Sequence, residues 1–305
     1  MRLRVGAYVI ELTHPDKVLF PGPRPLTKRD LVGYYRRIAP TMLPYLAGRP
    51  VVMQRFPDGI AGEGFFHKDI PDYFPEWIDR VTLPKKGGTV THVVCNHAAT
   101  LVYLASQACI TPHVWLSRAD RPRHPDRLIF DLDPPADDFA PVRRAARLVG
   151  TLLADLGLTT SVMTTGSRGA YVLVRLDRRA DFDVVRTFAR DAAALLVRRH
   201  PRELTIEPRV ADRGGRLYLD TGRNAYAQSA APPYAVRARP GAPVATPITW
   251  RELDRPSLDA RSYRADNVFR RLARASDPWR GLARRGQSLT RARAALTKLL
   301  GAAPS

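Results

Sequence analysis

Two aspartates stand two positions apart at the end of a short apolar run, in the segment LIFDLDP at residues 128–134. Side chains at positions i and i+2 of a β-strand point to the same face, so a strand here would hold Asp131 and Asp133 side by side. Carboxylates at that spacing repel each other unless a cation lies between them, and a hard divalent cation is their natural ligand. A strand that runs into a loop with two solvated acids is the alternative.

A third acid ends another apolar run, in the segment GRLYLDTGRN at residues 215–224. Asp220 could complete a set of three metal-binding carboxylates, and Arg223, three residues later, could contact a triphosphate. An ordinary surface arginine, or an ion-pair partner of Asp220, is the alternative for Arg223.

A phosphate-binding turn is suggested by the segment MTTGSRGAYV at residues 163–172, which lies between two short apolar runs. Its two glycines allow a close approach of the backbone, Thr165 and Ser167 offer hydroxyl groups, and Arg168 offers a guanidinium group. A plain hairpin with two glycines explains the same pattern, so the segment alone does not decide.

Cations and aromatic residues gather near the N-terminus. Lys17 and Lys28 lie near the start of a predicted helix, and a helix N-terminus with two ammonium groups can hold a phosphate. The glycine-rich segment at residues 54–68 adds Phe56, Phe65 and Phe66 among basic residues. Aromatic side chains among cations are typical stacking platforms for unpaired bases. Phe65 and Phe66 could equally be core residues of a strand.

Several other chemistries find no support. The sequence has no Walker loop, no HExxH and no G-x-S-x-G motif. Its two cysteines, Cys95 and Cys109, are too few for a disulfide framework or a cysteine-rich zinc site, and they are predicted to be buried thiols. The histidines do not follow metal-site spacing, and His113, in the string TPHVW, cannot be assigned from spacing.

The charge balance points to a polyanionic partner. The chain has 305 residues, and its 49 Lys and Arg exceed its 29 Asp and Glu by 20, which gives a formal net charge of +20. A folded protein this basic usually meets nucleic acid. The sequence contains no stretch of 18 apolar residues and no signal peptide, which predicts a cytoplasmic protein with no membrane partner.

The periodicity of apolar residues predicts a mixed α/β (α+β) fold. Helices are expected over residues 27–39, 137–156 and 182–197, and strands over residues 127–133, 171–176 and 216–220. Thr27 and Asp30 have the spacing of a helix capping box. Since no linker separates regions of different composition, we expect a single domain over residues 1–300 and a frayed end at residues 301–305. Two or three short helices are expected in the last 55 residues.

Two acids on one strand, a third on another, a hydroxyl–arginine turn and a strongly basic surface together favour two-metal phosphoryl transfer on nucleic acid. In that chemistry the carboxylates hold two cations, which stabilise the attacking and leaving oxygens. Charge and positioning then provide most of the catalysis.

Five strings of residues also resemble a known family. They are HPDKVLFP at 14–21, GFFHK at 64–68, PHVW at 112–115, FDLDP at 130–134 and YAVRARPG at 234–241. Together they resemble the polymerase domain of bacterial ligase D, of the archaeo-eukaryotic primase superfamily, which serves non-homologous end joining. The resemblance runs from about Ile10 to about Leu253 in the family's order. It implies a primase-like catalytic core with two mixed β-sheets flanked by helices, and a stand-alone polymerase domain.

The resemblance implies a role for each matched position. Asp131, Asp133 and Asp220 match catalytic metal-binding acids, which implies two divalent cations, Mn or Mg. The nucleotide and its triphosphate would be held by His113, Thr165, Ser167, Arg168, Tyr171, Arg223 and Arg237. A downstream 5′-phosphate and the template would be met by Lys17, Lys28, Phe56, Phe65 and Phe66.

The family resemblance also implies substrates and partners. The expected enzyme is a nucleotidyltransferase that adds an NTP or dNTP to a DNA 3′ end at a break or a gapped duplex with a 5′-phosphate. Ku and a separate DNA ligase are the implied protein partners, and the nucleoid the implied location. The family's turn reads Ser/Thr-Gly-x-Lys-Gly-x-His, whereas this chain has Arg168 for the lysine and Tyr171 for the histidine. A catalytically weak module that binds 5′-phosphorylated DNA ends, and a two-metal nuclease, are therefore the alternatives.

Overall fold

The protein divides into two compact units, each built from three separate stretches of the chain. The computed structural model describes residues 1–282 and 286–301. The first unit comprises Met1–Asp120, Ser229–Thr246 and Tyr263–Arg274, and the second comprises the remaining stretches, which begin at Arg121, Pro247 and Ala275. A single primase-polymerase domain stays a prediction. The predicted frayed end lies outside the described residues from position 302 onwards, and Gly301 closes the last helix.

The second unit is built on a six-stranded mixed sheet, in the order β13-β14-β10-β12-β11-β16. Its strands are β10 (Arg127–Asp133), β11 (Thr160–Thr164), β12 (Ala170–Arg175), β13 (Leu204–Thr205), β14 (Leu217–Asp220) and β16 (Thr246–Ile248). Every residue of β10 from Arg127 to Leu132 is buried, which explains its continuous apolar run. The strand ends at Asp133 because Pro134 cannot donate to the sheet.

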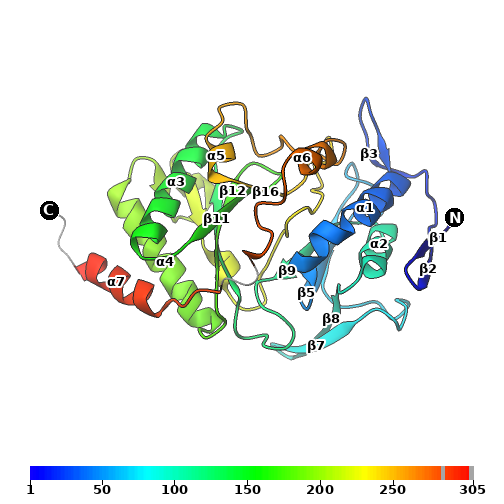
Figure 1. Ribbon diagram of the computed structural model, residues 1–305, viewed down its shortest axis with the longest axis horizontal. Helices are drawn as coiled ribbons and strands as arrows, with labels where there is room; N and C mark the ends of the chain where they lie inside the picture. Colours follow the sequence, from blue (N-terminus) through cyan, green and yellow to red (C-terminus); the bar gives the residue numbers. More distant parts are fainter. Residues whose placement is uncertain (283–285, 302–305) are drawn as a thin grey trace. The chain divides into compact units, whose positions relative to one another are not determined.

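Helices cover this sheet. Both α3 (Ala140–Asp155) and α4 (Phe182–Arg199) pack against β10 and against each other, and Figure 1 shows them side by side next to β11 and β12. The short helix α5 (Trp250–Leu253) contacts β11, and α7 (Thr290–Gly301) contacts α4. The apolar face of α3 is buried from Val142 to Leu153, so the helix is positioned by burial of one stripe.

The first unit contains the second large sheet, in the order β15-β9-β5-β8-β7, with β6 also paired to β5. Its strands are β5 (Pro50–Arg55), β6 (Phe65–His67), β7 (Arg80–Lys85), β8 (Gly88–Val94), β9 (Cys109–Trp115) and β15 (Ser229–Ala230). Two hairpins, β1 (Arg2–Val5) with β2 (Tyr8–Glu11) and β3 (Val18–Phe20) with β4 (Leu26–Thr27), complete its β-structure. All pairings of the large sheet are antiparallel, which corrects the expectation that both sheets are mixed.

Helix α1 (Lys28–Leu46) shows how packing extends a helix past its local stop signals. The capping box of Thr27 and Asp30 is present as predicted, but the helix continues through Pro40 and Pro44 to Leu46 instead of ending at Ala39. A proline inside a helix costs about 3 kcal/mol. Met42 and Leu46, which lie after Pro40, are among the buried side chains of this helix. Burying such a side chain stabilises the fold by about 1.5–3 kcal/mol, which offsets the cost of the prolines. They lie on a helix that packs against α2 (Ala98–Ser106).

The remaining sequence expectations fit closely. The predicted strand over 127–133 is confirmed, the strand over 171–176 is shifted by one residue, and the strand over 216–220 begins one residue later. The helix expected from residue 137 begins at Ala140, because Asp138 accepts a hydrogen bond from the Ala140 amide and precedes the first turn. Both cysteines are buried, and α6 (Val268–Arg274) joins α5 and α7 as the three late helices of the described chain. In these same residues no helix is long and apolar enough to cross a membrane.

Candidate active site

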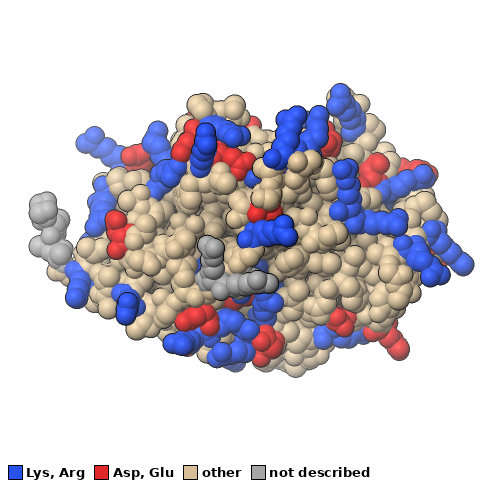
Figure 2. Space-filling view, viewed as in Figure 1, with Lys and Arg blue, Asp and Glu red and all other residues tan. Residues whose placement is uncertain are grey.

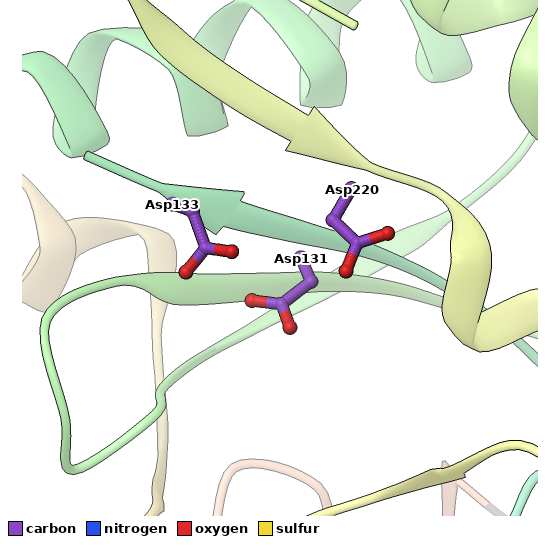
Figure 3. Close-up of side chains that lie close together, drawn as sticks. All are labelled: Asp131, Asp133 and Asp220. Carbon is purple, nitrogen blue, oxygen red and sulfur yellow. The ribbon is translucent and has the colours of Figure 1, made fainter. Parts of the chain in front are cut away.

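Three carboxylates converge on one face of the sheet in the second unit. Asp131 of β10 lies directly opposite Asp220 of β14 in the antiparallel register, and Asp133 lies opposite Tyr218. Directly opposed residues, and residues two apart on one strand, share a face of a sheet, so all three acids point the same way. One oxygen from each lies within 4.8 Å of the other two, and Figure 3 shows the carboxylates facing a common space. The predicted convergence is therefore confirmed by geometry.

The three carboxylates strain one another electrostatically. Burial, and next the neighbouring Asp133 carboxylate, raise the pKa of Asp131 to about 7. The pKa of Asp133 is also raised, first by burial and then by the charge of Asp220. Negative charge is thus concentrated where little water can screen it, which is the condition under which a divalent cation binds carboxylates well. Three hard oxygen donors fit magnesium or manganese.

Arg223 is the cation closest to this cluster. Its Nε lies 3.3 Å from an Asp131 oxygen and 3.9 Å from an Asp220 oxygen, and these acids together raise its pKa. It stands in the 3₁₀ turn η2 (Gly222–Asn224), where the Gly222 amide donates to Asp220 at 2.7 Å. The alternative prediction, that Arg223 forms an ion pair, is confirmed, and the pair includes Asp131 as well as Asp220.

Asn224 is a positioning residue that the sequence did not single out. Its side chain is fully buried, accepts a hydrogen bond from the Ile129 amide at 2.9 Å, and donates to the Ile129 carbonyl at 2.7 Å. This pair of bonds ties the η2 turn to β10 two residues before Asp131. Arg213 was also missed: its guanidinium lies over the Tyr218 ring at 4.2 Å and lowers the pKa of Asp133. The nearest signal in the sequence was only that both lie close to Asp220.

The predicted phosphate-binding turn joins β11 to β12 beside the same acids. A Cβ atom on Gly169 would lie 1.8 Å from the Leu132 carbonyl oxygen, so only glycine lets the turn approach β10 between Asp131 and Asp133. The Thr165 hydroxyl donates to the Gly169 carbonyl at 3.0 Å and accepts from the Ser167 amide at 3.2 Å. It therefore organises the turn from within. Arg168 is exposed, and its positive charge lowers the pKa of Asp133, one of the three acids.

Tyr171 lies on the face of the three acids. It is directly opposite Asp131 in the β10–β12 pairing, is only 4% exposed, and contributes to the raised pKa of Arg223. The alternative that it packs within the sheet is compatible with this burial. Its position nevertheless places a phenol where the related family carries a histidine.

The first unit gathers the N-terminal cations. Lys28, the first residue of α1, is 7% exposed and donates to the Thr13 carbonyl at 3.0 Å. Its pKa is lowered, first by burial and then by the charges of Lys17 and Arg55. Lys17 forms an ion pair with the exposed Asp58 at 2.6 Å. A partly desolvated lysine at a helix N-terminus, on which the charges of Lys17 and Arg55 act, makes a site that an anion would stabilise.

Aromatic side chains lie close to these cations. Phe65 and Phe66 of β6 are 45% and 57% exposed, so the strand-core alternative for them is wrong. The Phe56 ring lies so close to Gly64 that a Cβ there would meet it at 2.2 Å. His113 of β9 shares a hydrogen bond with the Gln54 side chain at 3.3 Å and meets Phe66 edge to face. Arg237 also belongs to the first unit, where its backbone amide donates a hydrogen bond to the Pro243 carbonyl.

The exterior of the protein is strongly basic. Figure 2 shows Lys and Arg side chains spread over the visible face and outnumbering the acidic ones. Acids held together on two adjacent strands, with an arginine among them and a basic exterior, are typical of metal-dependent enzymes that act on phosphate groups of a polyanion.

Comparisons with known proteins agree with this class. The model of the LigD primase-polymerase domain matches residues 27–279. The multifunctional non-homologous end joining protein LigD of Mycobacterium bovis is 35% identical over 277 residues, which are 88% of this chain and 36% of that protein. The bifunctional non-homologous end joining protein LigD of Bacillus subtilis is 29% identical, over 88% of this chain and 43% of that protein. The chain thus spans less than half the length of these curated relatives.

A solved structure matches the fold. The polymerase domain from Mycobacterium tuberculosis Ligase D in complex with DNA superimposes with a TM-score of 0.84 at 33% identity, covering 91% of this chain and 99% of that one. The chain therefore belongs to the LigD primase-polymerase family, which makes it a nucleotidyltransferase of the archaeo-eukaryotic primase superfamily. The family resemblance, the primase-like α/β fold with two large sheets and the enzyme class predicted from the sequence are confirmed.

The raised pKa of Asp131 predicts a pH-dependent stability. A carboxyl group with a folded pKa of about 7, above its unfolded value, destabilises the protein as pH rises from about 4 to 7. In EDTA at pH 8, Asp131→Asn should therefore raise the unfolding midpoint by roughly 2–6 °C. The gain should vanish below about pH 3, where the carboxyl is neutral in both the folded and the unfolded state.

Calorimetry across this pH range checks the prediction, with Asp155→Asn at the exposed end of α3 as the control. Adding Mn²⁺ should stabilise the wild-type protein more than Asp131→Asn. A lower midpoint for Asp131→Asn at pH 8 without metal would contradict the electrostatic account.

Proposed function

We propose that this protein is a DNA-repair polymerase that adds nucleotides to DNA 3′ ends at gaps or double-strand breaks by two-metal phosphoryl transfer. The observation that carries the proposal is the convergence of Asp131, Asp133 and Asp220 in a chain of the LigD primase-polymerase family. The relatives are named for non-homologous end joining, and the similar solved domain was captured with DNA. The net charge of +20 suits the same substrate.

The chain's own residues supply positioning and charge. Asp131, Asp133 and Asp220 would hold the divalent cations, manganese or magnesium, which when bound stabilise charge on the transferring phosphoryl group. Arg223 and Arg168 would orient the triphosphate of an NTP or dNTP, together with Thr165, Ser167 and Tyr171 of the same unit. For His113 and Arg237, which belong to the first unit, a role in nucleotide binding rests on the family resemblance alone.

The first unit would recognise the DNA beyond the gap. Lys28 is partly desolvated beside Lys17 and Arg55, so a doubly charged 5′-phosphate would relieve the repulsion among them. Exposed Phe65 and Phe66, with Phe56 behind them, would stack on unpaired template bases. Ku and a separate DNA ligase are the proposed protein partners, and a chromosomal substrate would place the protein at the nucleoid.

The second candidate function is a module that binds 5′-phosphorylated DNA ends with weak catalysis. It is favoured by Tyr171, where the family carries a histidine that can be charged. The cluster of acids, in which the pKa of Asp131 is raised to about 7, argues against it, because a pure binding module gains nothing from their repulsion. A nuclease with the same metals is the third reading, and one assay on gapped DNA separates elongation, binding and shortening.

Replacing Asp133 by Ala should abolish primer extension, by about a thousandfold or more, because a metal-binding carboxylate is lost. DNA affinity should stay within about twofold of wild type, since basic residues dominate it. Extension of a gapped, 5′-phosphorylated duplex with Mn²⁺ and nucleotides measures the first effect, and fluorescence anisotropy measures the second. A variant that extends primers at the wild-type rate would refute the assignment.

A gap with a 5′-phosphate should bind about tenfold more tightly than one with a 5′-hydroxyl, because a charge-assisted contact contributes roughly 1.5–3 kcal/mol. Lys28→Met should remove most of this preference. The control Lys298→Gln, on the exposed face of α7, should weaken binding to both ends equally. Anisotropy at fixed salt decides, and equal affinity of the wild-type protein for the two ends would exclude the pocket.

Tyr171→His should lower the KM for nucleotide about threefold with a smaller effect on kcat, because a histidine can donate as a charged group and charged hydrogen bonds are about twice as strong as neutral ones. Tyr171→Phe should raise the KM if the hydroxyl meets the nucleotide. Steady-state extension kinetics test both changes. If neither substitution moves the KM, the side chain serves only the packing of the sheet.

A further inference from the structure

Arg261 connects the turn between β11 and β12 to the segment that follows β10, the strand that carries Asp131 and Asp133. Its Nη2 donates to both oxygens of Asp137, at 2.5 Å and 2.7 Å, and its Nε donates to the Ser167 carbonyl at 2.7 Å. Asp137 follows β10 by four residues, and Ser167 sits at the tip of the turn. All three residues belong to the second unit. One guanidinium group therefore holds the two segments that flank the acids.

The turn itself supplies one hydrogen bond to its tip. The β11–β12 pairing ends at Thr164 and Ala170, the Thr165 hydroxyl and backbone bond Gly169 at the base, and the same hydroxyl accepts from the Ser167 amide at 3.2 Å. Gly166 at the tip adopts a left-handed conformation with φ of +66°. The inner side of the turn is fixed by the contact of Gly169 with β10. In the described chain, the Ser167 carbonyl at the tip of the turn accepts its hydrogen bond from Arg261.

Arg168 and Arg261 share a set of acidic neighbours. A cavity of about 110 Å³ is lined by Arg168 and Arg261 together with three acids, Asp137, Asp138 and Asp259. Because Arg261 occupies both oxygens of Asp137, that carboxylate is already neutralised when Arg168 lies beside it. Without Arg261, Asp137 would compete for Arg168 with an incoming phosphate.

We propose that Arg261 is a positioning residue for nucleotide binding: it fixes the tip of the 165–169 turn and keeps Arg168 directed to the triphosphate. The inference rests on the proposed function, because it assumes that this turn meets the nucleotide. Arg261 itself touches no reacting atom. Its loss should therefore weaken nucleotide binding and leave both the metal site and the chemical step almost unchanged.

The chain offers a matched control in Arg147. Like Arg261, Arg147 donates to both oxygens of one aspartate, here Asp254 through Nε and Nη2, and also to a backbone carbonyl, that of Trp250 at 3.0 Å. Both arginines have similar exposure, 45% for Arg147 and 40% for Arg261. Each ties the 247–262 stretch to the rest of the second unit, but Arg147 acts from α3 and does not contact the turn.

The experiment compares Arg261→Ala, Arg261→Lys and Arg147→Ala with the wild-type protein. Two readouts are taken with Mn²⁺ present: the KM and kcat for ATP in gap extension, and the Kd of a fluorescent ATP analogue. Arg261→Ala should raise the KM and the Kd about tenfold with kcat within about twofold. Arg261→Lys should lie between, because an ammonium group keeps the charge but lacks the fork that reaches both partners. Arg147→Ala should change neither constant.

Each alternative result overturns the inference. An equal rise in Kd for Arg147→Ala would show that loosening the 247–262 stretch is enough, and unchanged Kd in Arg261→Ala would show that the turn needs no support. If Arg261→Ala fails to fold by circular dichroism, Asp137→Asn replaces it, with a smaller rise expected in the same direction. Failure of the wild-type protein to extend a primer refutes the proposed function, whereas the ratio of nucleotide Kd values still decides the role of Arg261.

Discussion

The mutual repulsion of three converging carboxylates, one buried and two half-buried, is the constraint around which the second unit is organised. Asp131, Asp133 and Asp220 could relax apart in a flexible loop, but the register of β10 with β14 holds them on one face. Burial and hydrogen bonding of the sheet stabilise the fold enough to offset the repulsion among these carboxylates. The unfavourable charge is stored in the folded protein, and it is the reason why a divalent cation would bind there.

Cations are distributed so that they limit this repulsion without cancelling it. Of the three nearby arginines in the described chain, Arg223 lies within ion-pair distance of Asp131 and Asp220, while Arg213 and Arg168 act on Asp133 through their charge at longer range. The net result still leaves the pKa of Asp131 far above that of an ordinary aspartate. The face of the sheet that carries the acids therefore keeps an excess of negative charge beside arginine side chains.

Arginine also serves as a structural tie, which explains part of its abundance beyond the charge it supplies. Arg143 donates to the Leu253, Arg255 and Leu258 carbonyls, and Arg147 and Arg261 each join a carboxylate to a carbonyl. These planar groups with several donors can satisfy irregular backbone that has no sheet or helix partner. The 247–262 stretch is fixed largely in this way. Lysine, with a single point of charge, would not replace these contacts.

Local features of the site could be predicted from the sequence because they depend on neighbours along the chain. The strand at 127–133 and its stop at Pro134 follow from an apolar run before a proline, and the cap of α1 follows from Thr27 and Asp30. The recurrence of aspartates at i and i+2 was enough to place Asp131 and Asp133 on one face. The family strings identified the enzyme class, since long motifs in a fixed order seldom occur by chance.

Only the tertiary structure decided which distant residues meet. The opposition of Asp131 and Asp220 bridges 89 positions, and the bonds of Asn224 to Ile129 bridge 95. Phe65 and Phe66 had equal claims to core and surface until the pairing of β6 left them exposed. Tertiary contacts also decided that α1 continues past two prolines and that Arg261 bonds to the Ser167 carbonyl. Burial and strand register, which are set by packing across the whole unit, override the preferences of a short segment.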